Sequence, residues 1–122
     1  MNPHPKRVLC VEDEEDTCSM LTSLLGLINC EVVSAQTFDL AQQRIRDERF
    51  DLYLLDNWLP GGTGIDLCRE IRERDATTPI IFYSGAAYES DRQEARAAGA
   101  QAYLIKPTDI AKLMETVRTF LK

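Results

Sequence analysis

The sequence is poor in the residues that build zinc sites and disulfide frameworks. It has a single histidine, His4, and its four cysteines lie too far apart along the chain to form a CxxC pair. We therefore expect no zinc site. Cys10 continues an apolar segment and Cys68 lies on an apolar helix face, so we interpret the cysteines as small core residues of a reduced protein.

Long hydrophobic runs and excess positive charge are also missing. No apolar stretch approaches the roughly 20 residues of a membrane span, and residues 1–5 lack the apolar core of a signal peptide. The formal net charge is −6, from 20 acidic and 14 basic residues, which argues against a basic patch for nonspecific nucleic-acid binding. We expect a cytoplasmic protein that neither enters a membrane nor binds nucleic acid directly.

The chain has 122 residues and a mass of 13.8 kDa, the size of one domain, which we expect to cover residues 1–122. Short apolar, β-branched segments alternate with helical patterns, as they do in βαβ units. The predicted strands are residues 7–11, 31–35, 52–55, 80–83 and 102–105. The alternation predicts an α/β fold: a doubly wound, five-stranded parallel sheet in the order 2-1-3-4-5 with five helices, flavodoxin-like in architecture.

Helix signals lie between these strands. Apolar residues recur at helical spacing over residues 20–28 and in the last part of the chain. Acidic residues 14–16 fit the start of the first helix, because acids there complement the helix dipole. Thr37 and Thr63 are placed to cap the starts of two further helices, and Gly99 to close another.

Two predicted strands end on acidic residues. Glu12 and Asp13 follow strand 7–11, and Asp56 follows strand 52–55. In open parallel sheets, ligands bind at the carboxyl ends of strands where the winding reverses, here between the first and third strands. Two carboxylates about 4 Å apart repel by roughly 4 kcal/mol at an effective dielectric of about 20, so this group needs a cation. Mg²⁺ fits, because it accepts one or two carboxylates and leaves positions open for a phosphoryl oxygen.

The ends of the fourth and fifth predicted strands add a hydroxyl and an amine. Ser84 comes directly after strand 80–83 and is followed by Gly85 and Ala86, while Lys106 follows strand 102–105. A hydroxyl, a lysine and a metal around one carboxylate are typical of a phosphoryl-transfer pocket. Serine and lysine are common residues, and they indicate a site here only because both lie at the ends of predicted strands.

Taken in order, these motifs resemble the receiver domain of two-component response regulators, the CheY-like family, over nearly the whole chain. The resemblance is carried by Glu12 with Asp13, residues 56–60 with Gly64, residues 84–86, and residues 103–107. Each motif alone is common. Four of them in this order at the strand ends are specific to the family.

The resemblance implies that Asp56 is the phosphoacceptor, which takes a phosphoryl group from the phosphohistidine of a sensor histidine kinase or a phosphotransfer protein. It also implies Mg²⁺, with Mn²⁺ as an alternative ion. The implied metal ligands are Glu12, Asp13, Asp56 and the backbone carbonyl of Trp58. Because such a domain catalyses its own phosphorylation and dephosphorylation, it is a signalling switch rather than a turnover enzyme.

The family pattern also assigns roles at the last two strands. Lys106 is expected to pair with the phosphoryl group, Ser84 to donate a hydrogen bond to it, and the peptide bond before Pro107 to be cis. Phosphorylation is expected to draw Ser84 inward, after which Tyr103 rotates inward and changes the face formed by the fourth helix, fifth strand and fifth helix. That face is the expected surface for a downstream protein target, a fused effector domain or a phosphorylation-dependent homodimer.

Several residues of the site depart from the family's usual pattern. Glu12 stands in place of an aspartate, and Ser84 in place of the more frequent threonine. Trp58 and Ala86 occupy positions where family members often place polar side chains that orient the hydrolytic water. We therefore hypothesise a comparatively long-lived phosphoryl-aspartate.

Three other functions fit the sequence less well. A haloacid-dehalogenase-type enzyme needs a second aspartate two residues after the first, where this chain has Trp58. A nucleotide-binding protein needs a GxGxxG motif or a P-loop, and residues 61–64 match neither. These residues fit a turn before the third helix. A degenerate receiver that binds partners without phosphorylation is opposed by the intact Asp56 and Lys106. The sequence leaves open the cognate kinase, the output, the oligomeric state and whether the chain is part of a longer protein.

Overall fold

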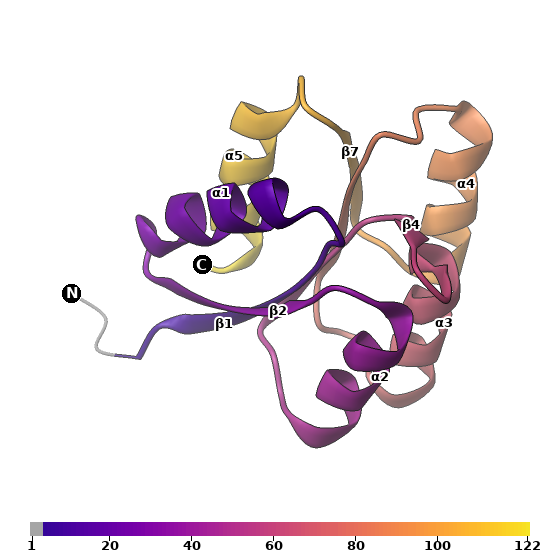
Figure 1. The fold of residues 1–122 in the computed structure, drawn as a ribbon, viewed down its shortest axis with the longest axis horizontal. Coiled ribbons are helices and arrows are strands. Elements are labelled where there is room, and N and C mark those ends of the chain that lie inside the picture. The colour runs from indigo at the N-terminus through magenta and orange to yellow at the C-terminus, as the bar shows by residue number, and fades with distance from the viewer. Residues whose placement is uncertain (1–3) are drawn as a thin grey trace.

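A parallel sheet with helices on both faces forms the protein (Figure 1). The computed structural model describes residues 4–122, so the first three residues of the segment searched for a signal peptide lie outside it. In spatial order, the strands of the sheet are β2 (Cys30–Ala35), β1 (Lys6–Val11), β3 (Leu52–Leu55), β6 (Ile80–Ser84) and β7 (Ala102–Ile105). The predicted strands and their order are confirmed, with boundaries that differ by at most one residue.

The helices lie on both sides of the sheet (Figure 1). They are α1 (Glu15–Gly26) and α5 (Ile110–Phe120) on one side, and α2 (Phe38–Asp47), α3 (Gly64–Arg74) and α4 (Glu89–Ala98) on the other. Alternate residues of each strand feed the two cores, because successive side chains point to opposite faces. Val8 packs with Leu25 and Leu113, whereas Leu9 packs in the core on the α2–α4 side.

Helix ends follow the signals in the sequence. The hydroxyls of Thr37 and Thr63 accept hydrogen bonds from the backbone N–H groups of Leu40 and Asp66, both at 3.1 Å. Gly99 closes α4 with a positive φ of 113°, a conformation that glycine adopts at little cost. These three helix boundaries were therefore predictable from local chemistry.

A small hairpin precedes α3 where the sequence predicted only a turn. β4 (Trp58–Leu59) pairs antiparallel with β5 (Gly62–Thr63). Gly61, in the connection between them, has a φ of 91°. The hairpin positions Trp58 directly beside the end of β3, with its side chain 63% exposed.

Strand register sets the position of the acidic residues. Val11, the last residue of β1, pairs with Leu55, the last residue of β3. The next residue of each strand is an acid, so Glu12 and Asp56 leave the sheet side by side at its carboxyl edge.

Among residues 4–122, no helix has both the length and the apolar character needed to cross a membrane.

Candidate functional site

Four strand ends bring the predicted site residues to the carboxyl edge of the sheet. Glu12 follows β1, Asp56 follows β3, Ser84 ends β6 and Lys106 follows β7. The backbone N–H of Glu12 donates to Ala35 and that of Asp56 to Val11, both at 3.0 Å, so hydrogen bonds of the sheet hold both acids in place.

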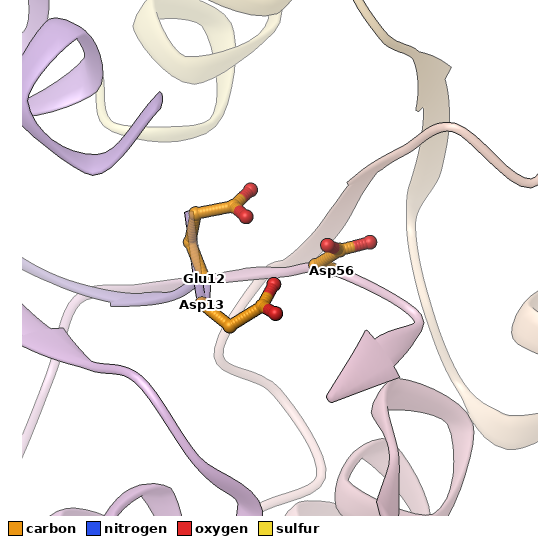
Figure 2. A group of neighbouring side chains, drawn as sticks. All are labelled: Glu12, Asp13 and Asp56. Carbon is orange, nitrogen blue, oxygen red and sulfur yellow. The ribbon is translucent and has the colours of Figure 1, made fainter. Parts of the chain in front are cut away.

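Three carboxylates form one cluster at this edge (Figure 2). Oxygens of Glu12, Asp13 and Asp56 all lie within 4.8 Å of one another. Figure 2 shows the Glu12 and Asp13 carboxylates pointing to the side on which Asp56 lies. Glu12 is 2% exposed and Asp56 7% exposed, whereas Asp13 is exposed to solvent. Two buried acids and one exposed acid therefore surround a space that opens to water.

Lys106 partly neutralises this cluster. Its Nζ lies 2.5 Å from Oε1 of Glu12 and 3.1 Å from Oδ2 of Asp56, with Glu14 at 3.8 Å. Burial by itself lowers the pKa of Lys106, but the hydrogen bonds and charges of Glu12 and Asp56 outweigh it and raise the pKa above 10.5. The charged form of Lys106 is therefore favoured, and its one positive charge lies beside three carboxylates.

Glu12, the buried acid beside Lys106, has a raised pKa, so it ionises less readily than a free glutamate. Burial raises the pKa of Glu12, and the nearby charge of Asp56 adds to this, while hydrogen bonds from Lys106 and the backbone N–H of Glu14 act in the opposite direction. The net shift is upward. Burial, more than the charge of Asp56, therefore opposes the ionisation of Glu12 even with Lys106 in place.

Two residues of the site were not identified from the sequence. Glu14, interpreted as a helix-start acid, donates its backbone N–H to Oε2 of Glu12 at 3.1 Å. Asn57 is 4% exposed and ties the end of β3 to α3: its backbone carbonyl accepts from Gly64 at 2.8 Å and its Oδ1 from Ile65 at 3.4 Å. The signal for Asn57 was its position next to Asp56, but its partners depend on the tertiary fold.

Gly64 is required by a close approach of backbone to backbone. A Cβ built at this position would collide with the backbone carbonyl oxygen of Asp56 and would also lie 2.9 Å from the Phe82 ring. The start of α3 therefore packs directly under the acidic cluster. This is the physical reason for a glycine at a position that the resemblance to the receiver family also includes.

The β6 and β7 ends are linked by a set of hydrogen bonds. The Ser84 hydroxyl is fully buried and accepts from the backbone N–H of Ala86 at 3.2 Å, while the backbone N–H of Lys106 donates to the Ser84 carbonyl at 3.0 Å. The peptide bond between Lys106 and Pro107 is cis, as the resemblance implies.

Tyr103 already points inward. Its side chain is buried, its hydroxyl donates to the carbonyl of Ala86 at 2.7 Å, and its ring stacks on Phe82 at 5.4 Å between centroids. The loop after β6 and the aromatic of β7 are therefore in contact, as a switch between them requires. The rotation itself stays a prediction.

The side chains at this edge of the sheet determine which ligands it can bind. Carboxylate oxygens are the ligands that hard divalent cations prefer, and one of them, from Asp56, also lies beside an ammonium group. A carboxylate oxygen that lies next to an ammonium group and to other carboxylates able to hold a metal ion is suited to interact with an anionic group. Ser84 offers a hydroxyl, which accepts a hydrogen bond from the backbone N–H of Ala86 through one lone pair and still has its own O–H to donate.

The comparisons with known proteins agree with this geometry. The family model for the response regulator receiver domain matches residues 8–118. The chain is 36% identical over 118 residues to the phosphate regulon transcriptional regulatory protein PhoB of Rhizobium meliloti, covering 95% of this chain and 52% of PhoB. The chain thus spans about half the length of that relative.

Solved structures share the fold. A CheY-like response regulator receiver domain protein from Methanospirillum hungatei superposes with a TM-score of 0.90 at 28% identity, covering 96% of this chain and 94% of the other. The BeF3-activated N-terminal receiver domain of Klebsiella pneumoniae RstA gives a TM-score of 0.88 at 30% identity, covering 95% and 98%. Both similarities extend over the whole sheet and its helices.

Proposed function

The chain belongs to the response regulator receiver domain family of two-component systems, and on that premise we propose that it is phosphorylated on Asp56 by a sensor histidine kinase or a phosphotransfer protein. The observation that carries the proposal is the arrangement of Glu12, Asp13 and Lys106 around one buried aspartate. We assign residues 1–122 to this single domain.

The acidic cluster fits a divalent cation. Lys106 is the cation paired with Glu12, Glu14 and Asp56, and Asp13 adds a further carboxylate, so the group keeps a net negative charge. We propose that Glu12, Asp13, Asp56 and the Trp58 carbonyl hold Mg²⁺, or Mn²⁺ in its place. When bound, such an ion neutralises the incoming phosphoryl oxygens and so supports transfer.

The protein's own groups account for the remaining steps. A carboxylate oxygen of Asp56 attacks the phosphorus of the donor, and the bond from phosphorus to the donor's leaving group breaks. Lys106, at 3.1 Å from Asp56, is placed to pair with the new phosphoryl oxygens. Ser84 lies at the end of the adjacent strand, and its hydroxyl hydrogen can be donated to the same group while its oxygen accepts from Ala86.

The contact between Ala86, in the loop after β6, and Tyr103 of β7 connects the phosphorylation site to the proposed docking surface. A phosphoryl group that recruits Ser84 also disturbs the Ala86 backbone, to which Tyr103 donates its hydrogen bond. We propose that this link transmits the modification to the face formed by α4, β7 and α5, where a downstream protein, an effector domain or a second copy docks. PhoB is a transcriptional regulatory protein. For this chain we propose only that its output is the docking of another protein.

Labelling with acetyl phosphate in Mg²⁺ buffer tests the phosphoacceptor. We expect the mass of the protein to increase by one phosphoryl group, and Asp56→Asn to lose this label while it keeps the far-UV spectrum of the wild type. Glu31→Gln, which removes an exposed acid beside Arg7 at the other end of the strands, is the matched control and should label normally. Label on Asp56→Asn at another residue would identify a different nucleophile.

Beryllofluoride tests the alternative of a degenerate receiver. The RstA receiver domain was solved in a BeF3-activated form, and we expect the same reagent with Mg²⁺ to change the fluorescence of Trp58, which is exposed and follows Asp56 by two residues. No response in the wild type would favour a module that binds partners without phosphorylation.

We also propose that the phosphoryl group is long-lived. Neither the Trp58 indole nor the Ala86 methyl can accept a proton from an attacking water, and Trp58 is exposed beside the site. We expect Trp58→Asn to lose label faster than the wild type in Mg²⁺ buffer. Rapid loss from the wild type at a rate that Trp58→Asn leaves unchanged would contradict this.

A further inference from the structure

A cavity lies at the amino edge of the sheet, at the opposite end of β3 from the acidic cluster. It is formed by the last turns of α2 and α3 and by the loops that follow these helices. Figure 1 shows α2 and α3 side by side, with these ends in the lower part of the view. The cavity has a volume of about 1000 Å³. Pockets of this size hold small-molecule ligands.

Three arginines that line the cavity have no partner for their side chains. Arg46 lies in the last turn of α2, Arg74 in the last turn of α3 and Arg49 in the loop between α2 and β3. All three are exposed, and within residues 4–122 none of their guanidinium groups forms an ion pair or a hydrogen bond. The planar fork of donors on arginine matches the oxygens of a phosphate group. These donors are therefore available to an anionic ligand.

The acids of the cavity are mostly engaged with other groups. The lining holds four arginines and four acids. Glu48 binds Arg7 at 2.6 Å, and the carboxylate of Asp51 accepts from the backbone N–H of Arg7 at 2.8 Å. Asp75 accepts from two backbone N–H groups of the loop that follows it, both at 3.0 Å. Of these four acids, only Asp47 has no partner within residues 4–122. The unpaired charges are thus three arginines and one aspartate.

Tyr53 adds a hydrogen-bond donor from inside the cavity. It lies in β3, lines the cavity and is only 4% exposed. Its ring contacts Phe50 edge-on at 5.8 Å between centroids, but its hydroxyl has no hydrogen-bond partner within residues 4–122. Every fully buried polar side-chain atom in that range does have a partner. The Tyr53 hydroxyl is therefore open to the cavity, where a ligand can accept its hydrogen bond.

We propose that this cavity binds a phosphate monoester of nucleotide size. Arg46, Arg49 and Arg74 hold the phosphate group, because they supply donors that nothing else in the fold uses. Tyr53 donates to a polar atom of the organic part, which packs against the apolar wall that includes Ile45. The site uses neither the proposed phosphoacceptor nor a metal ion, so it is independent of the proposed function.

An NMR titration of isotope-labelled protein with adenosine monophosphate in EDTA buffer tests the site. The chelator removes divalent cations and so keeps the carboxyl edge free of metal. We expect saturable shifts of the backbone amides of residues 46–51 and 74–78, and weaker binding of inorganic phosphate and of adenosine, each of which makes only part of the contacts. No shifts in these segments, shifts that do not saturate, or equal affinity for adenosine or for phosphate would overturn the proposal.

Arginine variants separate ligand binding from helix stability. We expect Arg46→Gln and Arg74→Gln each to weaken binding of adenosine monophosphate by about tenfold, because each removes charge-assisted hydrogen bonds to the phosphate. Arg69→Gln is the matched control: this exposed arginine of α3 pairs with Asp66 and lies outside the cavity, so its loss should leave the affinity unchanged. Basic residues near the end of a helix also stabilise it through its dipole. Lower stability of Arg46→Gln with unchanged affinity would reduce the arginine to that role and overturn the proposal.

Tyr53→Phe tests the hydroxyl without removing the ring. Because the hydroxyl has no partner in the folded chain, we expect the free energy of unfolding to stay close to that of the wild type and the affinity to fall about threefold. Unchanged affinity would contradict the role of Tyr53. Asp56→Asn should bind adenosine monophosphate as the wild type does, and a loss of binding there would place the ligand at the carboxyl edge and overturn the proposal. Failure of acetyl phosphate labelling would contradict the proposed function alone.

Discussion

The two edges of the parallel sheet both carry charged side chains, but they balance them in different ways. At the amino edge, Arg7 contacts Glu48 at 2.6 Å and Glu31 at 3.8 Å, and Arg44 contacts Glu48 at 2.8 Å. These three ion pairs join two cations to two acids on side chains that solvent reaches, and the carboxylate of Asp51 accepts from the backbone N–H of Arg7 at 2.8 Å. At the carboxyl edge, Lys106 faces several carboxylates, two of which are buried.

The pKa shifts at the two edges run in opposite directions. Hydrogen bonds from Arg7 and then Arg44 lower the pKa of Glu48, because they stabilise its charged form. Burial and then the charge of Asp56 raise the pKa of Glu12. The acid at the amino edge is thus paired and solvated, whereas the acid at the carboxyl edge is buried and shares one cation with other carboxylates. Four experiments test this contrast between the two edges.

The largest effect is expected from Gly64→Ala. The added Cβ collides with the Asp56 backbone, so α3 must shift or β3 must give way, at a cost of about 3 kcal/mol in the free energy of unfolding. Gly26→Ala near the amino edge is the control: nothing lies within 4 Å of its added Cβ, and we expect a stabilisation of about 0.5 kcal/mol. Urea unfolding measures both. A Gly64→Ala variant that is as stable as Gly26→Ala would mean that the backbone approach at Gly64 leaves room for a methyl group.

Removing the cation at each edge should have unequal costs. Lys106→Met leaves Glu12 and Asp56 without their counter-charge in a buried site, and we expect it to lower the free energy of unfolding by about 3 kcal/mol in metal-free buffer at neutral pH. Arg7→Met breaks pairs that water can replace, and we expect at most about 1 kcal/mol. A larger loss in Arg7→Met would reverse the assignment of the two edges.

Divalent cation should act on one edge only. We expect Mg²⁺ to raise the free energy of unfolding of the wild type, by about 2.7 kcal/mol at a free concentration one hundred times its Kd. Asp13→Asn should reduce this gain, because Asp13 contributes a carboxylate to the cluster. Glu31→Gln at the amino edge should keep it. Thermal unfolding with and without a chelator gives the measurement, and an equal gain in Asp13→Asn would exclude that residue as a ligand.

The smallest effect is a difference in acid response. Glu48, whose pKa is lowered, contributes stability above pH 4.5 that is lost as pH falls through its folded-state pKa. Glu12, whose pKa is raised, contributes stability below pH 4.5 that is lost as pH rises through its folded-state pKa. Glu48→Gln should therefore flatten the loss of stability on acidification in metal-free buffer, and Glu12→Gln should steepen it. The same direction of change in both variants would contradict the contrast.

Much of the fold could be predicted from local patterns. Continuous apolar runs such as residues 52–55 identified strands covered on both faces, and Thr37, Thr63 and Gly99 marked helix ends by their own hydrogen bonds or backbone freedom. The hairpin formed by β4 and β5 was not predicted. Strands of two residues are too short to show a periodic pattern.

The site was predictable in its residue types and less so in its contacts. The acids at the ends of two strands and the lysine after a third pointed to one edge of the sheet, because parallel strands end together. The hydrogen bond from the Glu14 backbone to Glu12 and the inward position of Tyr103 could not be predicted in this way. Each depends on how a helix or loop packs against a strand.

By itself, the sequence determined the order of strands and helices, the helix ends and the acids that terminate two strands, because these follow from spacing and local hydrogen bonding. Only the tertiary structure decided that Lys106 lies 3.1 Å from Asp56, fifty residues earlier, and that Gly64 packs against the Asp56 backbone. Such contacts depend on strand register and on the packing of side chains between layers. Those are properties of the folded chain as a whole, and no local segment contains them.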